Sequence, residues 1–358
     1  MFERFAVIAL ISLAGCGWAN PPADLQNASA GHSGPPNVSQ KYLYLGLNTG
    51  TGPTLVVYPL DGSKPLRKIV DSWRVSDLAV DPWGDVYTSD DNPSGGEVTA
   101  YTSGGRSALF SMYAGGVSCM TFDARGDLYA CEDEYVEEFA PRSSKRIRVA
   151  RDAQNVWAIA LDRAGNVYAA QLTGAGSESN GAVKVFRPRE QRPFRVLHHG
   201  ISNPTALAFD SHGNLYVANC PGCWQEKRTG SVAEYAPGSD RPLRVLRNGI
   251  NSPNSLAIGP GDELFVANNV SYTTDANPDA TIKSRAWISV YGPTGHSPKH
   301  RISGFDQVPQ ITLDAQGNLY AIAVANDKGE VAVFNQRYSR VRTITDGVKD
   351  AQAIAIGP

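Results

Sequence analysis

The sequence lacks an excess of charge of either sign. Its 33 basic and 35 acidic residues leave a formal net charge of −2, and only 19% of the residues are charged. Nucleic-acid binding requires a basic surface that neutralises phosphates, so the composition gives no electrostatic case for a nucleic-acid partner. The 42% of hydrophobic residues supply enough apolar material for a core, which excludes a chain that is disordered throughout.

Hydrophobic runs long enough to cross a membrane are also missing near the N-terminus. The apolar stretch FAVIALISLAG at residues 5–15 is too short for a bilayer, which needs about 20 apolar residues. Its length and position suit the hydrophobic region of a signal peptide. The stretch ends in Leu13-Ala14-Gly15-Cys16, which resembles the lipobox of bacterial lipoproteins.

This resemblance implies that residues 1–15 are a lipoprotein signal peptide and that Cys16 becomes the lipidated first residue. Several acyl chains would then hold the protein firmly on a membrane, because one chain alone is marginal. Gly17 stands where an Asp would retain a lipoprotein in the inner membrane, which favours the outer membrane of a double-membraned bacterium. The alternative is ordinary secretion with cleavage after Ala19. Residues 16–40, rich in Gly, Pro, Ser, Ala and Asn, are typical of a flexible tether.

Long helices are disfavoured by 35 Gly and 23 Pro, whereas turn-rich β structure uses both residues. The rest of the chain repeats one unit, in which an apolar strand ends in Asp-x-x-Gly and a second strand with a central aromatic residue follows. The aromatic residues recur every 46 residues on average between the first and the last. They are Tyr44, Tyr87, Tyr129, Tyr168, Tyr216, Phe265 and Tyr320.

Two further strands complete each unit, and four short strands in about 45 residues are typical of a β-propeller blade. The first unit lacks its first strand. The C-terminal AQAIAIGP (351–358) matches the first strand of a unit, and no second strand follows it. We therefore predict an all-β, seven-bladed propeller over residues 41–358, closed by pairing of the C-terminal strand with the N-terminal strands. The pattern resembles NHL-type repeats and the seven-bladed propeller of streptogramin lyases.

The repeated Asp residues can cap their own turns, and Gly supplies positive φ, so we interpret them as structural rather than metal-binding. These residues are Asp81, Asp123, Asp162, Asp210 and Asp314. The repeated aromatics are predicted to form the core between blades. Arginines on the fourth strands could form an anion-binding stripe or deter pairing at the edge of each sheet, and the second role is favoured. They are Arg67, Arg148, Arg195, Arg244 and Arg342.

Numbering the strands of a blade from the axis, the 2–3 and 4–1 connections must share one face of the disc. These connections vary in length, and the 2–3 loops at 89–97, 171–181, 219–230 and 268–286 are the long ones. Variable loops on a rigid scaffold commonly carry binding sites. We therefore place the candidate site on this face, which also holds His198 in a 4–1 connection and Trp224, Tyr272 and Trp287 in or beside the long loops.

One register on this face collects oxygen-bearing side chains three residues after each repeat aromatic. Five of the seven positions are carboxylates or amides: Asp90, Glu132, Gln171, Asn219 and Asn268; the others are Leu47 and Ala323. Such a ring could hold a cation such as Ca²⁺, or the hydroxyls of a sugar. The alternative, that these residues cap strand ends, is favoured. Asp90 with Asp91, beside Glu132 with Asp133, is the best metal candidate.

Five cysteines are present, and four remain if Cys16 carries lipid. The hairpin register places Cys119 opposite Cys131, so a cross-strand disulfide is feasible. Cys220 and Cys223 form a Cys-Pro-Gly-Cys segment in a long loop. In an exported protein this segment is predicted to be a loop-stapling disulfide rather than a free redox pair. A zinc site is excluded because no second Cys-x-x-Cys exists.

These observations favour a monomeric binding or scaffold module at the cell envelope, presenting its loop-rich face to a protein or glycan. Polar loops with aromatic residues suit such contacts. The alternative is a metal-dependent enzyme of the lyase or lactonase kind, with its site over the central channel. The resemblance to streptogramin lyases supports this alternative in blade number only, because the Glu-x-His that their chemistry requires is missing near the last blades. The sequence therefore favours a protein that is not an enzyme.

Overall fold

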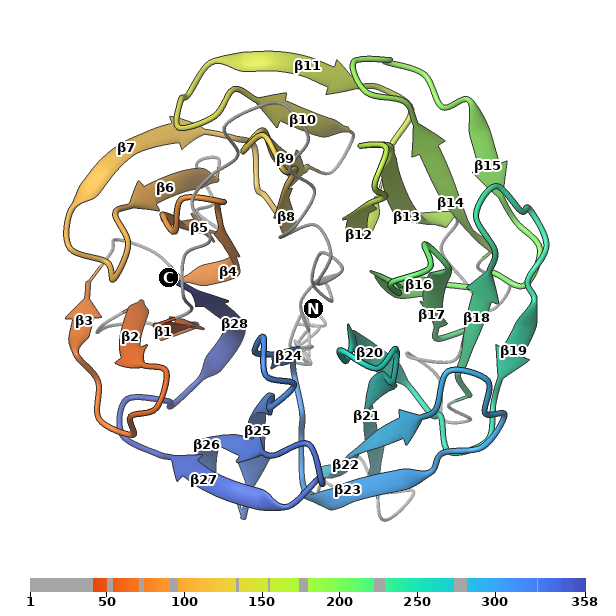
Figure 1. Ribbon diagram of the computed structural model, residues 1–358. Coiled ribbons are helices and arrows are strands. Elements are labelled where there is room, and N and C mark those ends of the chain that lie inside the picture. Colours follow the sequence, from red (N-terminus) through yellow and green to blue (C-terminus); the bar gives the residue numbers. More distant parts are fainter. Residues whose placement is uncertain are drawn as a thin grey trace, which may run out of the picture.

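The computed structural model describes residues 41–49, 54–70, 74–90, 96–132, 135–153, 155–173, 180–221, 229–273, 282–326 and 328–358. Every regular element in these ranges is a β-strand, and the strands form seven four-stranded antiparallel sheets. The sheets surround a central axis as the blades of a propeller (Figure 1). Within the same ranges, no helix has the length and hydrophobicity that crossing a bilayer demands.

The first three blades follow one another along the chain, each with its strands in order from the axis outward. Blade 1 contains β28 (Ala351–Gly357), β1 (Tyr42–Leu47), β2 (Leu55–Pro59) and β3 (Arg67–Ile69). Blade 2 contains β4 (Val75–Val80), β5 (Val86–Asp90), β6 (Glu97–Tyr101) and β7 (Ala108–Tyr113). Blade 3 contains β8 (Cys119–Phe122), β9 (Leu128–Cys131), β10 (Val136–Phe139) and β11 (Arg146–Ala150).

The other four blades have the same order of strands. Blade 4 contains β12 (Val156–Leu161), β13 (Val167–Thr173), β14 (Asn180–Phe186) and β15 (Arg195–Leu197). Blade 5 contains β16 (Pro204–Phe209), β17 (Leu215–Asn219), β18 (Ser231–Tyr235) and β19 (Arg244–Leu246). Blade 6 contains β20 (Pro253–Ile258), β21 (Leu264–Thr273), β22 (Ile282–Tyr291) and β23 (His300–Phe305). Blade 7 contains β24 (Ile311–Leu313), β25 (Leu319–Ala325), β26 (Lys328–Phe334) and β27 (Arg340–Ile344).

The two ends of the propeller close the ring in the predicted way. The C-terminal β28 is the innermost strand of blade 1 and pairs antiparallel with β1, with Leu43 opposite Ile356. The amide of Lys41 continues the pairing by donating to the carbonyl of Gly357 over 2.8 Å. In Figure 1, β28 lies between β1 and the axis. The prediction of seven blades closed by the C-terminal strand is confirmed.

The Asp-x-x-Gly turns have the structural role that the sequence predicts. In each of these five turns, one carboxylate oxygen accepts from the amides two and four residues later; for Asp210 the distances to the amides of His212 and Asn214 are 2.9 and 2.8 Å. The turn glycine has a left-handed backbone, with φ of +81° at Gly213. The repeat aromatics are also buried, from fully for Tyr44 to 5% exposed for Tyr168, and they pack in the cores between blades as predicted.

Three of the five fourth-strand arginines have a role that the sequence does not predict, because they link one blade to the next. Arg148 donates to the carbonyls of Arg187 and Glu190 in the 3–4 turn of blade 4, over 2.9 and 2.5 Å. Arg244 donates to the carbonyl of Gly295 in blade 6 over 2.7 Å. Arg342 donates to the carbonyl of Leu60 in blade 1 over 2.5 Å. These guanidinium groups are therefore occupied by backbone carbonyls and do not form an anion-binding stripe.

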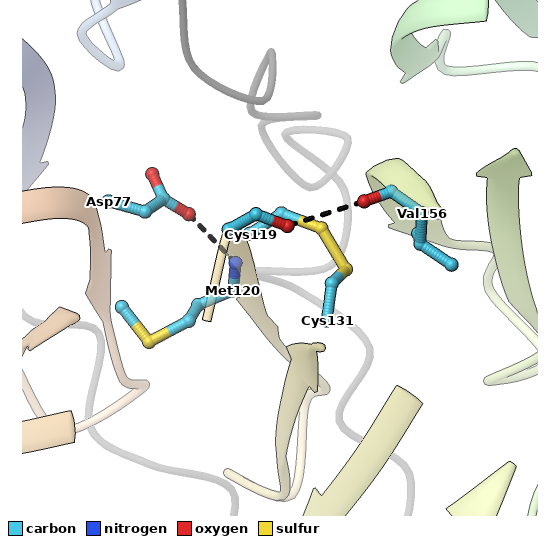
Figure 2. The surroundings of a disulfide bond; sticks show 6 residues. Asp77, Cys119, Met120, Cys131 and Val156 are labelled. Carbon is cyan, nitrogen blue, oxygen red and sulfur yellow. Dashed lines mark hydrogen bonds between the residues drawn. A yellow bond between two sulfur atoms is a disulfide. The ribbon is translucent and has the colours of Figure 1, made fainter. Parts of the chain in front are cut away.

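Side chains also link neighbouring inner strands around the axis. The carboxylate of Asp77 accepts from the amide of Met120 over 2.7 Å, and the hydroxyl of Ser118 donates to the carbonyl of Val156 over 3.3 Å. Figure 2 shows both links on either side of the disulfide between Cys119 and Cys131. The two cysteines pair across β8 and β9 with a Cα–Cα distance of 5.1 Å, as the hairpin register predicts.

The 1–2 and 3–4 turns share one face of the disc, which we call the smooth face. Their contact is direct, since Arg142 from a 3–4 turn lies 2.6 Å from the carboxylate of Asp85 in a 1–2 turn. The same guanidinium lies over Trp83. Burial is the main cause that raises the pKa of neighbouring Asp81 to about 6, and the charge of Asp85 adds to it.

The outer turns of the smooth face carry exposed cations, which we call the basic ring. The seven 3–4 turns hold three acidic residues, Asp61, Glu190 and Asp240. They hold ten basic residues, all of them exposed: Lys64, Arg106, Arg142, Lys145, Arg187, Arg189, Arg192, Arg241, Lys299 and Arg337. Exposed apolar side chains follow these turns in six blades, and we call them the apolar rim: Leu66, Leu109, Ile147, Phe194, Leu243 and Val341.

Two glycines with almost the same φ, Gly126 in a 1–2 turn of the smooth face and Gly116 in a 4–1 connection, allow a matched test of packing on the smooth face. A Cβ at Gly126 (φ +86°) would lie 2.2 Å from the Trp83 ring, whereas one at Gly116 (φ +83°) would meet nothing within 4 Å. Gly116→Ala should lower the free energy of unfolding by about 1 kcal/mol, the cost of the left-handed backbone. Gly126→Ala should lower it by about 3 kcal/mol, because steric overlap with the ring adds to that cost. Guanidinium unfolding measures both, and equal losses would contradict the packing argument.

Candidate binding face

The 2–3 and 4–1 connections lie on the face opposite the turns, which we call the loop face. Its predicted long loop at 268–286 is shorter than expected, because β21 and β22 extend the hairpin to Thr273 and from Ile282. Trp287 consequently lies in a strand, 8% exposed, with its indole N–H donating to the carbonyl of Gly249 over 3.0 Å. Trp224 lies outside the described residues, and for Tyr272 only the backbone is described.

Two amides of the predicted oxygen ring form hydrogen bonds with the 4–1 connections that lead into their own blades; we call these places the corners of the blades. Oδ1 of Asn219 accepts from the amide of Ser202 over 2.9 Å, and its Nδ2 donates to the carbonyl of Gly200 over 3.0 Å. Oδ1 of Asn268 likewise accepts from the amide of Asn251 over 2.9 Å, while its Nδ2 donates to the carbonyl of Val266 within the blade over 2.9 Å. Asn219 is 1% exposed and Asn268 is fully buried. Both amides therefore join a second-strand end to the 4–1 connection beside it, which is the capping role.

The other three members of the ring have different surroundings. Oδ1 of Asp90 accepts from the amide of Glu97 over 2.8 Å. Glu132 is buried and lies beside Gly115, and Gln171 is buried. Asp91 and Asp133 lie outside the described residues. Among the residues that the structure describes, no three His, Cys, Asp or Glu side chains form a group that could hold a metal ion.

The remaining predicted site residues are placed as follows. His198 and His199 are exposed in the 4–1 connection before β16, where the hydroxyl of Tyr235 donates to the carbonyl of His199 over 2.6 Å. Cys220 is buried and disulfide-bonded, and Cys223 lies outside the described residues. Cys16, with the whole proposed signal and tether, also lies outside them.

A left-handed residue immediately before the first strand recurs on this face, and the repeat pattern of the sequence does not predict it. Positive φ occurs there at Asn155, Asn203, Ser252 and Asp350. The carbonyl of Asn203 accepts from the amide of Cys220 over 2.9 Å, and that of Ser252 from the amide of Asn269 over 3.1 Å. The residue types give the available signal, since Gly, Asn and Asp tolerate this conformation better than other residues.

Blades 5 and 6 bury polar groups at these corners that have no hydrogen-bonding partner among the described residues. Asn203 is 1% exposed, and neither Nδ2 nor Oδ1 has a hydrogen-bonding partner within the described part of the chain. The same holds there for Oγ of Ser252, 3% exposed, and Oδ1 of Asn254. The hydroxyl of Thr205 donates to the carbonyl of Pro253 over 2.7 Å, so the two corners are adjacent. We call Asn203, Ser252 and Asn254 the polar corner.

A separate hollow of about 530 Å³ lies at the outer edge between blades 6 and 7. Its lining includes Gly304, which has a φ of +102° at a register shift of β23, together with Lys328, Glu330 and Arg340. The guanidinium of Arg340 already pairs with the carboxylate of Glu330 over 2.5 Å. Its charge is thus neutralised from within the blade, and the polar corner is the stronger candidate for a ligand.

No family model matches the chain, and no curated protein is similar to it in sequence. Solved structures share its fold. A protein from Lactobacillus plantarum has a TM-score of 0.65 at 14% identity, over 89% of this chain and 100% of that one. Hydrazine synthase of Kuenenia stuttgartiensis has a TM-score of 0.59 at 14% identity, over 79% and 86% of the chains.

The WD40 β-propeller domain of Doa1 is similar as well, with a TM-score of 0.60 at 11% identity, over 86% of this chain and 95% of that one. At these identities the similarity establishes the propeller fold alone. The fold is consistent with a binding or scaffold module, because propellers place variable connections on a rigid ring.

Proposed function

We propose that the chain is a binding module of NHL-type repeats, anchored in the bacterial outer membrane through Cys16, which binds a protein or glycan at its loop face. The polar corner carries this proposal. A buried polar group without a hydrogen bond costs about 1–3 kcal/mol, and a ligand that supplied the missing partner would offset this cost. Amide and hydroxyl groups match the backbone of a peptide or the hydroxyls of a sugar, both of which donate and accept.

The experiment places a photo-crosslinking residue at His198, exposed beside the polar corner, or at Arg106, exposed on the smooth face. Crosslinking in the intact envelope, followed by mass spectrometry, should capture a partner from His198 alone. Asn203→Ala with Ser252→Ala should lower the yield about 30-fold, since two lost hydrogen bonds at about 1 kcal/mol each total about 2 kcal/mol and 1.4 kcal/mol is a factor of ten. Ser144→Ala with Gln191→Ala, two exposed smooth-face residues, is the matched control and should leave the yield unchanged.

A labelled glycan array probed with the same variants covers a glycan partner. Equal capture from both faces, or capture that the Asn203 and Ser252 changes do not alter, would overturn the proposal. Metal-dependent hydrolysis of a lactone panel, lost in Asp90→Ala with Glu132→Ala, would favour the alternative lyase or lactonase. Guanidinium unfolding of each variant separates loss of binding from loss of folding.

A further inference from the structure

We propose that the smooth face docks on an anionic phospholipid surface through the basic ring and the apolar rim, and so turns the loop face away from the membrane. This proposal rests on the proposed lipid anchor at Cys16. It deepens that proposal by naming the face that meets the lipid.

The point at which the N-terminal segment leaves the propeller favours this face. The amide of Lys41 donates to the carbonyl of Gly357 over 2.8 Å, and its carbonyl accepts from the amide of Leu60 over 2.7 Å. Leu60 begins a 3–4 turn, so Lys41 lies on the smooth face. A chain that is held to a membrane through residue 16 would therefore have the smooth face nearer to its point of attachment.

Charge on the smooth face is segregated, although the whole chain has a net charge of −2. None of the nine acidic residues of its inner turns is exposed. Five are buried, namely Asp81, Asp85, Asp127, Asp210 and Asp314, and four are half-buried, namely Asp123, Asp162, Asp262 and Glu263. The outer turns hold ten exposed cations and three exposed carboxylates. Three of the cations, Arg142, Arg187 and Lys299, pair with Asp85, Glu190 and Glu263, so the outer turns keep a local excess of positive charge. A local basic ring of this kind is attracted to anionic lipid within about a Debye length, some 10 Å at 0.1 M salt.

The apolar rim distinguishes a lipid surface from a soluble polyanion. Its six side chains are between 40% and 61% exposed. Each lies either one proline beyond the last cation of a turn or at the second position of the following strand. Basic residues next to exposed apolar side chains are the combination by which proteins lie in the headgroup region of a bilayer. A nucleic acid or an acidic glycan would leave Phe194 and Leu243 in water.

The test measures sedimentation of the chain from residue 17 onward with vesicles of phosphatidylcholine, with or without 30 mol% phosphatidylglycerol. This chain contains all seven sheets, which lie within residues 42–357, and no acyl chain. We expect binding to the phosphatidylglycerol vesicles that weakens steeply with salt. Lys145→Gln, Arg192→Gln and Arg241→Gln together should weaken it about 100-fold, since each cation contributes about 1 kcal/mol and 1.4 kcal/mol is a factor of ten.

The matched control is Arg74→Gln, Arg247→Gln and Lys349→Gln, which changes the net charge equally on exposed residues of the 4–1 connections and should leave vesicle binding unchanged. Phe194→Ser with Leu243→Ser should weaken binding about tenfold at every salt concentration, because the lost contribution is apolar burial. Equal losses in the two charge variants would overturn the proposal. So would binding to heparin or DNA that matches vesicle binding and ignores the apolar changes.

Failure of docking is distinguishable from failure of the proposed function. If the smooth face does not dock, the vesicle assay fails while crosslinking from His198 still captures a partner. If the loop face has no partner, crosslinking fails while the basic-ring variant still loses vesicle binding. If Cys16 is not lipidated, metabolic labelling with a palmitate analogue gives no signal in the full chain, whatever the two other assays show.

Discussion

Deleting residues 351–358 is expected to abolish cooperative unfolding of the propeller. The deletion removes β28, the innermost strand of blade 1, whose Ile354 is 1% exposed and packs with Leu43 and Leu45. It also breaks the link from the amide of Ile354 to the side chain of Gln310 in blade 7, 2.8 Å long. Blades 1, 2 and 7 would lose their contacts at once, a loss comparable to the whole stability of a domain, about 5–15 kcal/mol.

Thermal unfolding followed by circular dichroism measures this effect. The truncated chain should give no sharp transition, and light scattering should show association, because the exposed edge of β1 can pair with other chains. Ile354→Val is the control, since loss of one buried methylene should cost only about 1 kcal/mol. A truncated chain that melts cooperatively near the temperature of the full chain would show that the ring does not depend on this closure.

The parts of the structure that could be predicted from the sequence are those that each repeat encodes locally. Asp210 and Gly213 specify their turn through four consecutive residues, and the same pattern recurs in the other blades. The register between Cys119 and Cys131 follows from that turn, because a hairpin fixes which residues face each other. The closure by β28 follows from counting strands. None of these inferences depends on which blades are neighbours in space.

The parts that could not be predicted depend on contacts between blades. Arg148 and Arg244 lie on edge strands, and the carbonyls that they bind lie about 40 to 50 residues further along the chain. No local pattern reveals such a partner. The polar corner is similar, because the burial of Asn203 depends on how the 4–1 connection crosses the loop face. The extended hairpin of blade 6 resembles a loop in sequence, because six of the ten residues at 269–273 and 282–286 are polar and three of them, at 283–285, are consecutive.

The arginines that link neighbouring blades lead to the second large prediction, which concerns the buried ion pair of Arg148. Its Nε lies 2.8 Å from the carboxylate of Glu138, and both side chains are 3% exposed. Burial raises the pKa of Glu138, and the guanidinium of Arg148 opposes that shift. Arg148→Ala should therefore lower the free energy of unfolding by about 3–5 kcal/mol, the cost of leaving one buried charge without its partner.

Guanidinium unfolding measures this loss. Arg187→Ala is the matched control, because that side chain is 55% exposed and lies 3.5 Å from Glu190, which is 48% exposed, an arrangement worth about 0–1 kcal/mol. Its backbone carbonyl still accepts from Arg148. The double change Arg148→Met with Glu138→Leu should recover a large part of the stability, because no charge is then buried alone. A double variant as unstable as Arg148→Ala would mean that the contacts with the carbonyls of blade 4, rather than the ion pair, carry the effect of this arginine.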